Sequence, residues 1–206
     1  MREQGPKLFQ ADTRRMAVMG ASAGGYLTLT AGYRARPRPT VLVSFYGYGD
    51  LVGDWYSRPS PHACHHRTQM TREEALRQVS GCPIADARDR PGDGGAFYQH
   101  CRQHGLWPQA VSGWDPHAET AKFHPFMPVT NVTRDYPPTM LIHGTDDTDV
   151  PYEQSVLMSE QFKIHGVPYE LVTIEGGEHG LRGGDPMRID DAYESALAFV
   201  KRHLER

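Results

Sequence analysis

One serine lies in a run of small residues that is typical of a catalytic nucleophile, the stretch Gly20-Ala21-Ser22-Ala23-Gly24-Gly25. A serine at a sharp turn between a strand and a helix needs small neighbours, because larger side chains two positions away would collide across the turn. Backbone N–H groups at the start of the following helix would favour an anion that develops beside the serine. The pattern predicts Ser22 as a nucleophile and the N–H of Ala23 as an oxyanion donor. A glycine-rich turn that binds phosphate or merely packs tightly is the alternative.

Two later loops carry the partners that a serine nucleophile needs, a base and a carboxylate that orients the base. The first loop follows an apolar run and contains three carboxylates, those of Asp146, Asp147 and Asp149. The second loop, residues 175–180, holds His179 between glycines after the last apolar run. His143 also stands near the end of an apolar run, and the glycine that follows it indicates a packing role at the turn.

The elements that must position these side chains follow an alternating pattern. Four short apolar runs rich in β-branched and aromatic residues predict strands buried on both faces, at 16–19, 40–46, 139–143 and 169–174. Helical patterns follow at 24–35, 152–165 and 186–204. Strands that alternate with helices predict an α/β fold with a parallel sheet of about four strands in sequential order. Ligands of such sheets gather at the carboxyl ends of the strands, which is where all three loops fall.

The segment 50–135 interrupts this pattern. It is rich in Pro, Gly, His and Trp and contains no strand candidate, whereas short helices are expected at 71–79 and 94–104. We interpret the chain as one α/β domain, residues 1–206, with 50–135 as a helical insertion and a possible lid over Ser22. Trp107 and Trp114 are the lid candidates.

The motifs resemble those of a known superfamily. Residues 12–30 resemble the nucleophile region of α/β-hydrolase esterases of the acetyl-esterase and hormone-sensitive-lipase type, and of the related prolyl-oligopeptidase-like hydrolases. Residues 143–151 resemble the H-G-x-x-D-x-x-V-P acid loop of these enzymes, and 177–180 their G-x-H-G base loop. The order Ser, Asp, His is also theirs. The resemblance implies a triad of Ser22, Asp147 and His179, with Asp146 and Asp149 as turn residues.

The resemblance covers about residues 8–50 and 138–206, so part of the family's pattern is missing. In the family the nucleophile follows the fifth strand, but only nineteen residues precede the motif here. A His-Gly-Gly loop that supplies further oxyanion donors in the family is absent from the sequence. We therefore expect the C-terminal half of a hydrolase, with slow turnover and a bare edge on the first strand. Such an edge favours self-association or pairing with a missing N-terminal half.

Composition excludes several other classes of protein. A net charge of −3 argues against a nucleic-acid partner, and no apolar run approaches the length of a membrane span. The start of the chain has no signal-peptide pattern, which makes the cytoplasm the default location. Three cysteines do not form a disulfide framework. The group His62, Cys64, His65 and His66 could bind a metal but has no second ligand pair at a recognisable spacing, so neither a metal nor another cofactor is expected.

Together these observations predict a serine hydrolase that cleaves small carboxylic esters through an acyl-serine. Tyr26 and Tyr48 are the candidates for contact with the substrate. Tyr48 belongs to an aromatic group after the second strand, which either lines an acyl or alcohol pocket or packs in the core: Phe45, Tyr46, Tyr48, Trp55 and Tyr56. Two alternatives stay open. One is a serine peptidase of the prolyl-oligopeptidase type, and the other is a non-catalytic remnant that acts through its exposed sheet edge.

Overall fold

The computed structural model describes residues 3–82, 84–90 and 92–205, and these divide into two compact units. The first unit is built from the chain up to Asp50 and from Pro125 onwards. The second unit comprises Leu51–His124. The first unit contains the sheet and all the residues of the expected triad.

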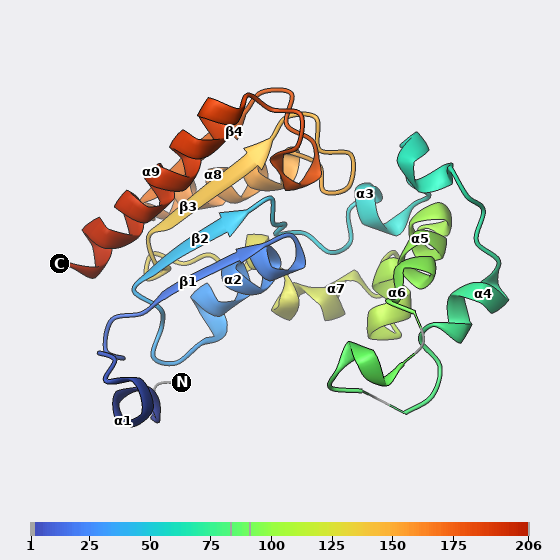
Figure 1. Ribbon diagram of the computed structural model, residues 1–206, viewed down its shortest axis with the longest axis horizontal. Coiled ribbons are helices and arrows are strands. Elements are labelled where there is room, and N and C mark those ends of the chain that lie inside the picture. Colours follow the sequence, from blue (N-terminus) through green and yellow to red (C-terminus); the bar gives the residue numbers. More distant parts are fainter. Residues whose placement is uncertain (1–2, 83, 91, 206) are drawn as a thin grey trace. The chain divides into compact units, whose positions relative to one another are not determined.

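The sheet of the first unit has four parallel strands in sequential order (Figure 1). The strands are β1 (Ala17–Ala21), β2 (Val41–Phe45), β3 (Thr139–Gly144) and β4 (Tyr169–Ile174). In register, Gly20 lies opposite Ser44, and His143 lies opposite Thr173. The predicted α/β fold with about four parallel strands is confirmed.

The prediction that every strand is buried on both faces is wrong for two of them. β2 and β3 are buried along their whole length, but β1 and β4 are largely half-buried or exposed. β1 and β4 each pair with one neighbour among the described strands, so their outer sides lack the cover that the central strands have. Met19 of β1 is 44% exposed. An apolar run therefore marks a strand but does not tell its place in the sheet.

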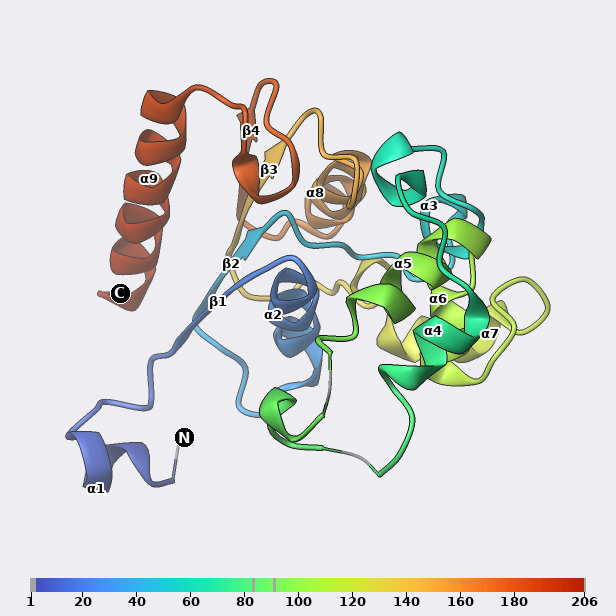
Figure 2. The ribbon, with the colours of Figure 1, turned by 45° about the vertical axis from the view of Figure 1, so that its right-hand side comes forward.

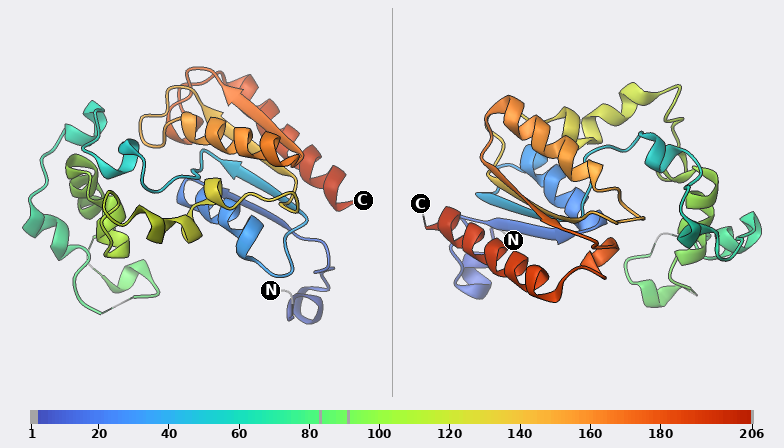
Figure 3. Two further views of the ribbon diagram at one scale, coloured as in Figure 1. Left: turned by 180° about the vertical axis from the view of Figure 1, so that it is seen from behind. Right: turned by 90° about the horizontal axis from the view of Figure 1, so that it is seen from above.

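Helices cover both faces of this sheet (Figures 2 and 3). α2 (Ala23–Arg34) and α8 (Glu153–His165) pack on one face, where Leu29, Met158 and Phe162 form a core with Leu42 and Leu141. α9 (Pro186–Leu204) packs on the other face. There, Ala192, Ala196 and Phe199 meet Val41, Val43 and Ile142. α1 (Gly5–Phe9) precedes the sheet.

Local signals account for where the long helices begin and end. Asp185 caps α9 by accepting a hydrogen bond from the N–H of Met187 at 2.9 Å, and Pro186 occupies the first turn. Gly166 ends α8 in the left-handed conformation, with φ 68°. Among the described helices none is long and apolar enough to cross a membrane.

The second unit is helical, with no strand among its described residues. Its α-helices are α3 (Asp54–Ser57), α4 (Arg72–Arg77), α5 (Gly95–His104), α6 (Trp107–Ser112) and α7 (Thr120–Phe123). Short 3₁₀ turns complete the two units, at Ala63–His66, Ala87–Asp89, His124–Phe126, Pro128–Thr130 and His179–Leu181.

The second unit has its own interior. The guanidinium of Arg102 is buried and lies over the rings of Trp55, Tyr56 and Tyr98, with 5.5, 5.5 and 6.0 Å to the ring centroids. A buried cation of this kind is stabilised by the negative faces of the aromatic rings.

Candidate active site

Ser22 occupies the turn between β1 and α2 in a strained backbone conformation, with φ 55° and ψ −122°. The turn is held by a hydrogen bond from the Ser22 N–H to the Phe45 carbonyl, 3.0 Å long. Small residues are required here because a Cβ at Gly20 would collide with the Gly24 carbonyl group. The turn presents the Ser22 side chain at the carboxyl end of β1, directly before the N-terminus of α2.

His179 links Ser22 to Asp147. Its Nε2 lies 3.0 Å from Ser22 Oγ, and its Nδ1 lies 2.8 Å from Asp147 Oδ2. Because a carboxylate only accepts, Nδ1 carries the proton and Nε2 is left to accept the hydroxyl proton of Ser22. These contacts join residues from three strand ends into one hydrogen-bonded chain. The structure thus brings together all three residues of the expected triad.

The Asp147 carboxylate is fully enclosed, with 0% of its side chain exposed. Its Oδ1 accepts hydrogen bonds from the backbone N–H groups of Asp149 at 2.9 Å and Val150 at 2.8 Å. Burial by itself would raise the pKa of Asp147, but hydrogen bonds from His143, His179 and Val150 outweigh it and lower the pKa to about 2. Asp147 is therefore ionised at neutral pH.

The pKa of His179 is raised above its ordinary value. Burial lowers it, but the hydrogen bond to Asp147 and the negative charges of Asp147, Asp149 and Glu178 have the larger combined effect. Asp149 Oδ2 lies 3.7 Å from Nε2 of His179, the nitrogen that faces Ser22. The expected role of Asp149 as a turn residue alone is therefore incomplete, because its charge acts on the base. Asp146 is exposed and takes no part in the triad.

Glu178 fastens the acid loop to the base loop. Its Oε1 accepts from the N–H of Thr148 at 2.7 Å and from the N–H of His179 at 2.9 Å. Burial by itself would raise the pKa of Glu178, but these hydrogen bonds have the larger effect and lower the pKa below its ordinary value. Glu178 is therefore ionised at neutral pH. The loops also touch through their backbones, since a Cβ at Gly144 would collide with the Gly177 carbonyl group. Both contacts hold His179 and Asp147 at a set separation.

The oxyanion and substrate candidates lie around this chain. Ala23 is the first residue of α2, so its N–H has no partner within the helix and stands beside Ser22. Tyr26 and Tyr48 stack on each other with centroids 5.0 Å apart, and Tyr26 donates to the Phe126 carbonyl at 2.9 Å. Tyr48 is only 7% exposed. Contact of these tyrosines with a substrate stays a prediction.

Tyr46 contacts the base of the triad directly. Its ring meets the His179 ring edge-on, with centroids 5.0 Å apart. It adopts a φ of 36°, and its N–H donates to the Ile142 carbonyl at 2.7 Å. The sequence places Tyr46 in the aromatic group after β2 but contains no signal for this turn, because a positive φ is uncommon in a bulky residue.

The remaining aromatic and metal candidates lie in the second unit. Trp107 packs with Tyr56 and Tyr98, and Trp114 meets Phe123 edge-on. A lid formed by this unit stays a prediction. The described residues contain no group of three His, Cys, Asp or Glu side chains placed to hold a metal ion.

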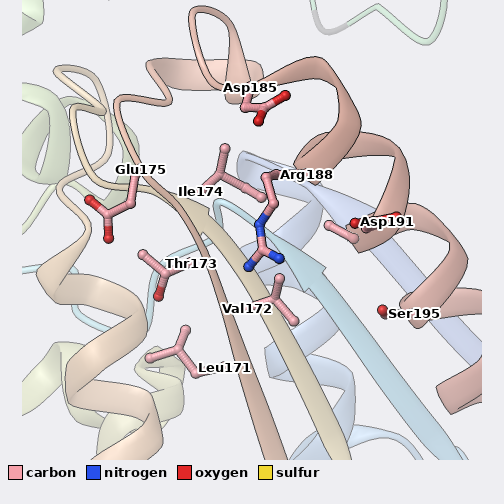
Figure 4. A pocket seen from close by; sticks show the side chains of 10 residues that line it. Leu171, Val172, Thr173, Ile174, Glu175, Asp185, Arg188, Asp191 and Ser195 are labelled. Carbon is pink, nitrogen blue, oxygen red and sulfur yellow. The ribbon is translucent and has the colours of Figure 1, made fainter.

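A hollow of about 670 Å³ lies between β4 and α9 (Figure 4). Arg188 extends from α9 into it toward Val172 and Thr173, and Asp185 and Asp191 stand on its helix side (Figure 4). Its lining includes none of the three triad residues.

The fold and this hydrogen-bonded chain define a serine hydrolase of the α/β-hydrolase superfamily. The family model described as "Prolyl oligopeptidase family" matches residues 79–206, more than half of the chain and the part that contains Asp147 and His179. The chain belongs to the prolyl oligopeptidase family.

Solved structures share the fold at low sequence identity. A truncated carbohydrate esterase from gut microbiota is 18% identical, with a TM-score of 0.63 over 100% of this chain and 65% of that one. The acylaminoacyl peptidase of Pyrococcus horikoshii is 19% identical, with a TM-score of 0.67 over 99% of this chain and 26% of that one. A non-reducing polyketide synthase of Preussia isomera is 23% identical over 82% of this chain but only 8% of its own length. The chain thus spans less than two thirds of each relative.

Proposed function

We propose that this chain hydrolyses small carboxylic esters through an acyl-serine intermediate. The observation that carries the proposal is the hydrogen-bonded chain Ser22–His179–Asp147, with 3.0 and 2.8 Å between its polar atoms. Two similar structures favour an ester over other acyl substrates, because one is a carbohydrate esterase and another is an acetyl ester-xyloside bifunctional hydrolase.

The reaction follows from the geometry of the three side chains. Ser22 Oγ attacks the ester carbonyl carbon while its proton moves to Nε2 of His179. The negative charge that develops on the carbonyl oxygen is stabilised by the N–H of Ala23 at the start of α2. The imidazolium then gives its proton to the leaving alcohol, and the acyl group stays on Ser22. Water, deprotonated by His179, attacks the acyl-serine carbonyl carbon. The imidazolium then returns the proton to Ser22 Oγ as the bond to the acyl group breaks and the acid leaves. Asp147 keeps Nδ1 protonated throughout and stabilises the positive charge on the ring.

A peptide substrate is the second candidate, because the family is one of peptidases and acylaminoacyl peptidases share the fold. The same three side chains would serve, with an amine as the leaving group.

Two measurements test these proposals. A fluorophosphonate probe should label the chain and not Ser22→Ala, because labelling needs an activated serine. Hydrolysis of p-nitrophenyl acetate should exceed that of a proline-containing peptide amide by more than the intrinsic difference in reactivity of the two substrates. Preference for the amide after that correction would favour the peptidase. Absence of labelling and turnover would favour a non-catalytic role through the edge of β1.

A further inference from the structure

His143 is a buried histidine with polar partners on both ring nitrogens. It is the last residue but one of β3, and none of its side chain is exposed. Nδ1 lies 2.7 Å from Ser155 Oγ of α8. Nε2 lies 2.9 Å from the Val150 carbonyl oxygen and 3.2 Å from Asp147 Oδ2. The ring therefore connects α8 to the acid of the triad.

These partners define which nitrogen carries the proton. A carbonyl oxygen can only accept, so the Nε2 that faces Val150 is protonated. In the neutral ring Nδ1 is then the acceptor, and the Ser155 hydroxyl donates a hydrogen bond to it. Ser155 is only 2% exposed. The Nε2–H donates to the Val150 carbonyl oxygen at 2.9 Å, and Asp147 Oδ2, 3.2 Å from Nε2, lies beside the same hydrogen.

We propose that His143 is a positioning residue of the triad, whose Nε2–H holds Asp147 Oδ2 where it meets His179, while Ser155 fixes the ring from behind. The inference rests on the proposed function, since only a reaction at Ser22 needs Asp147 in this place. A buried carboxylate needs donors at both oxygens. Backbone N–H groups serve Oδ1, but at Oδ2 the donors are two histidines, His179 and His143.

A role in packing alone would not need this arrangement. An apolar side chain of similar size could fill the space between β3 and α8 without a polar contact. With such a side chain, Oδ2 would keep only the Nδ1–H of His179, the ring that must also accept the Ser22 proton at Nε2. His143 gives Asp147 Oδ2 a second donor, which comes from outside the His179–Ser22 pair that exchanges the proton.

The charged and titratable groups around the pair come from every adjoining element. Asp149 and Glu178 place carboxylates near His179, and Arg182 donates to the His179 carbonyl oxygen at 3.2 Å. The rings of Tyr46 and Tyr152 flank His179 and His143. None of these contacts replaces the donor that His143 supplies to Oδ2.

The test compares two substitutions that differ only in the donor. His143→Gln places an amide N–H near the position of Nε2, whereas His143→Leu fills the space without a donor. His165→Leu is the matched control, because His165 is exposed at the end of α8 and contacts no triad residue. For each variant, kcat and KM on p-nitrophenyl acetate are measured against pH, with the melting temperature. The titration of His179 is followed by NMR, which needs no turnover.

We expect His143→Leu to lower kcat by about 10- to 100-fold, the scale of a lost hydrogen bond to a charged group, with little change in KM. The pKa of His179 should rise, because a carboxylate with one donor fewer attracts the imidazolium more strongly. His143→Gln should restore most of kcat and the original titration. The control should leave both unchanged.

Two results would overturn the inference. In the first, His143→Gln and His143→Leu lower kcat equally, and the loss of kcat follows the loss in melting temperature, which is the behaviour of a packing residue. In the other, the His179 titration is the same in wild type and His143→Leu. If the wild-type chain shows no turnover but the titration still moves, the proposed ester hydrolysis fails and the positioning by His143 stands.

Discussion

Replacing the Asp147 carboxylate by an amide should reverse the direction of the hydrogen bonds in the triad. Oδ1 accepts from two backbone N–H groups, so the amide introduced by Asp147→Asn must place its oxygen there and its NH₂ at the Oδ2 position. That NH₂ would face Nδ1 of His179 and the Nε2–H of His143. To accept from the amide, His179 must move its proton to Nε2, where it can no longer take the proton of Ser22. We expect Asp147→Asn to lower kcat by about 10⁴-fold, the scale seen for this exchange in other triads.

The same substitution should lower the free energy of unfolding. The pKa of Asp147 falls from its ordinary 3.8 to about 2 in the folded chain. This difference corresponds to about 2 kcal/mol in favour of the folded state. Because the folded pKa is the lower one, the contribution is complete above pH 3.8 and is lost as the pH falls through about 2. Asp147→Asn should therefore be less stable by about 2 kcal/mol at pH 7, with the difference narrowing below pH 4.

The assay pairs ester hydrolysis at neutral pH with urea denaturation at several pH values. Asp146→Asn is the matched control, because Asp146 is an exposed neighbour in the same loop. A kcat for Asp147→Asn within about tenfold of wild type would refute the assignment of the acid. A stability difference that persists unchanged to the lowest pH would refute the account of its ionisation.

Three further predictions concern the surroundings of the triad. Asp149→Asn should lower the pKa of His179 and move the acidic limb of the kcat/KM profile to lower pH; an unmoved limb would show that the 3.7 Å contact has no influence on the base. Gly144→Ala should force the loop at Gly177 away, lowering kcat by about 10²-fold and the melting temperature as well; unchanged kinetics would mean that the contact is not needed for alignment. Met19→Lys should reduce self-association at the edge of β1, as followed by analytical ultracentrifugation, and a wild-type chain that is monomeric at all concentrations would contradict this.

Much of the first unit could be predicted from local patterns. Parallel strands and the helices after them leave strong signals, such as the apolar run before Ser22 and the Asp185-Pro186 start of α9. To predict which carboxylate is the acid of the triad, the resemblance to the family's acid loop was also needed. Three carboxylates share that loop, and composition does not separate Asp147 from its neighbours. The structure shows the physical difference, since only Asp147 is enclosed and meets Nδ1 of His179.

The contacts that align the triad could not be predicted, because each depends on two segments that are far apart in sequence or on a loop that folds back. From the sequence, Glu178 is an ordinary loop carboxylate, and only the structure shows that the N–H of Thr148 donates to it. From the sequence, His143 is a packing residue at a turn, and only the folded loop brings Asp147 next to it. The exposure of β1 and β4 likewise depends on strand order and not on the residues of either strand.

The backbone of Ser22 bears on whether this turn could be left over from a lost activity. At a φ of 55° and a ψ of −122°, glycine would be the favourable residue, and any other side chain costs about 1–3 kcal/mol. A turn selected only for folding would gain stability by exchanging serine for glycine, and such gains are open to a chain released from the demands of function. Serine at this position makes the fold less stable than glycine would. Its presence supports the proposed use of the hydroxyl as a nucleophile by an argument that does not depend on any distance in the triad.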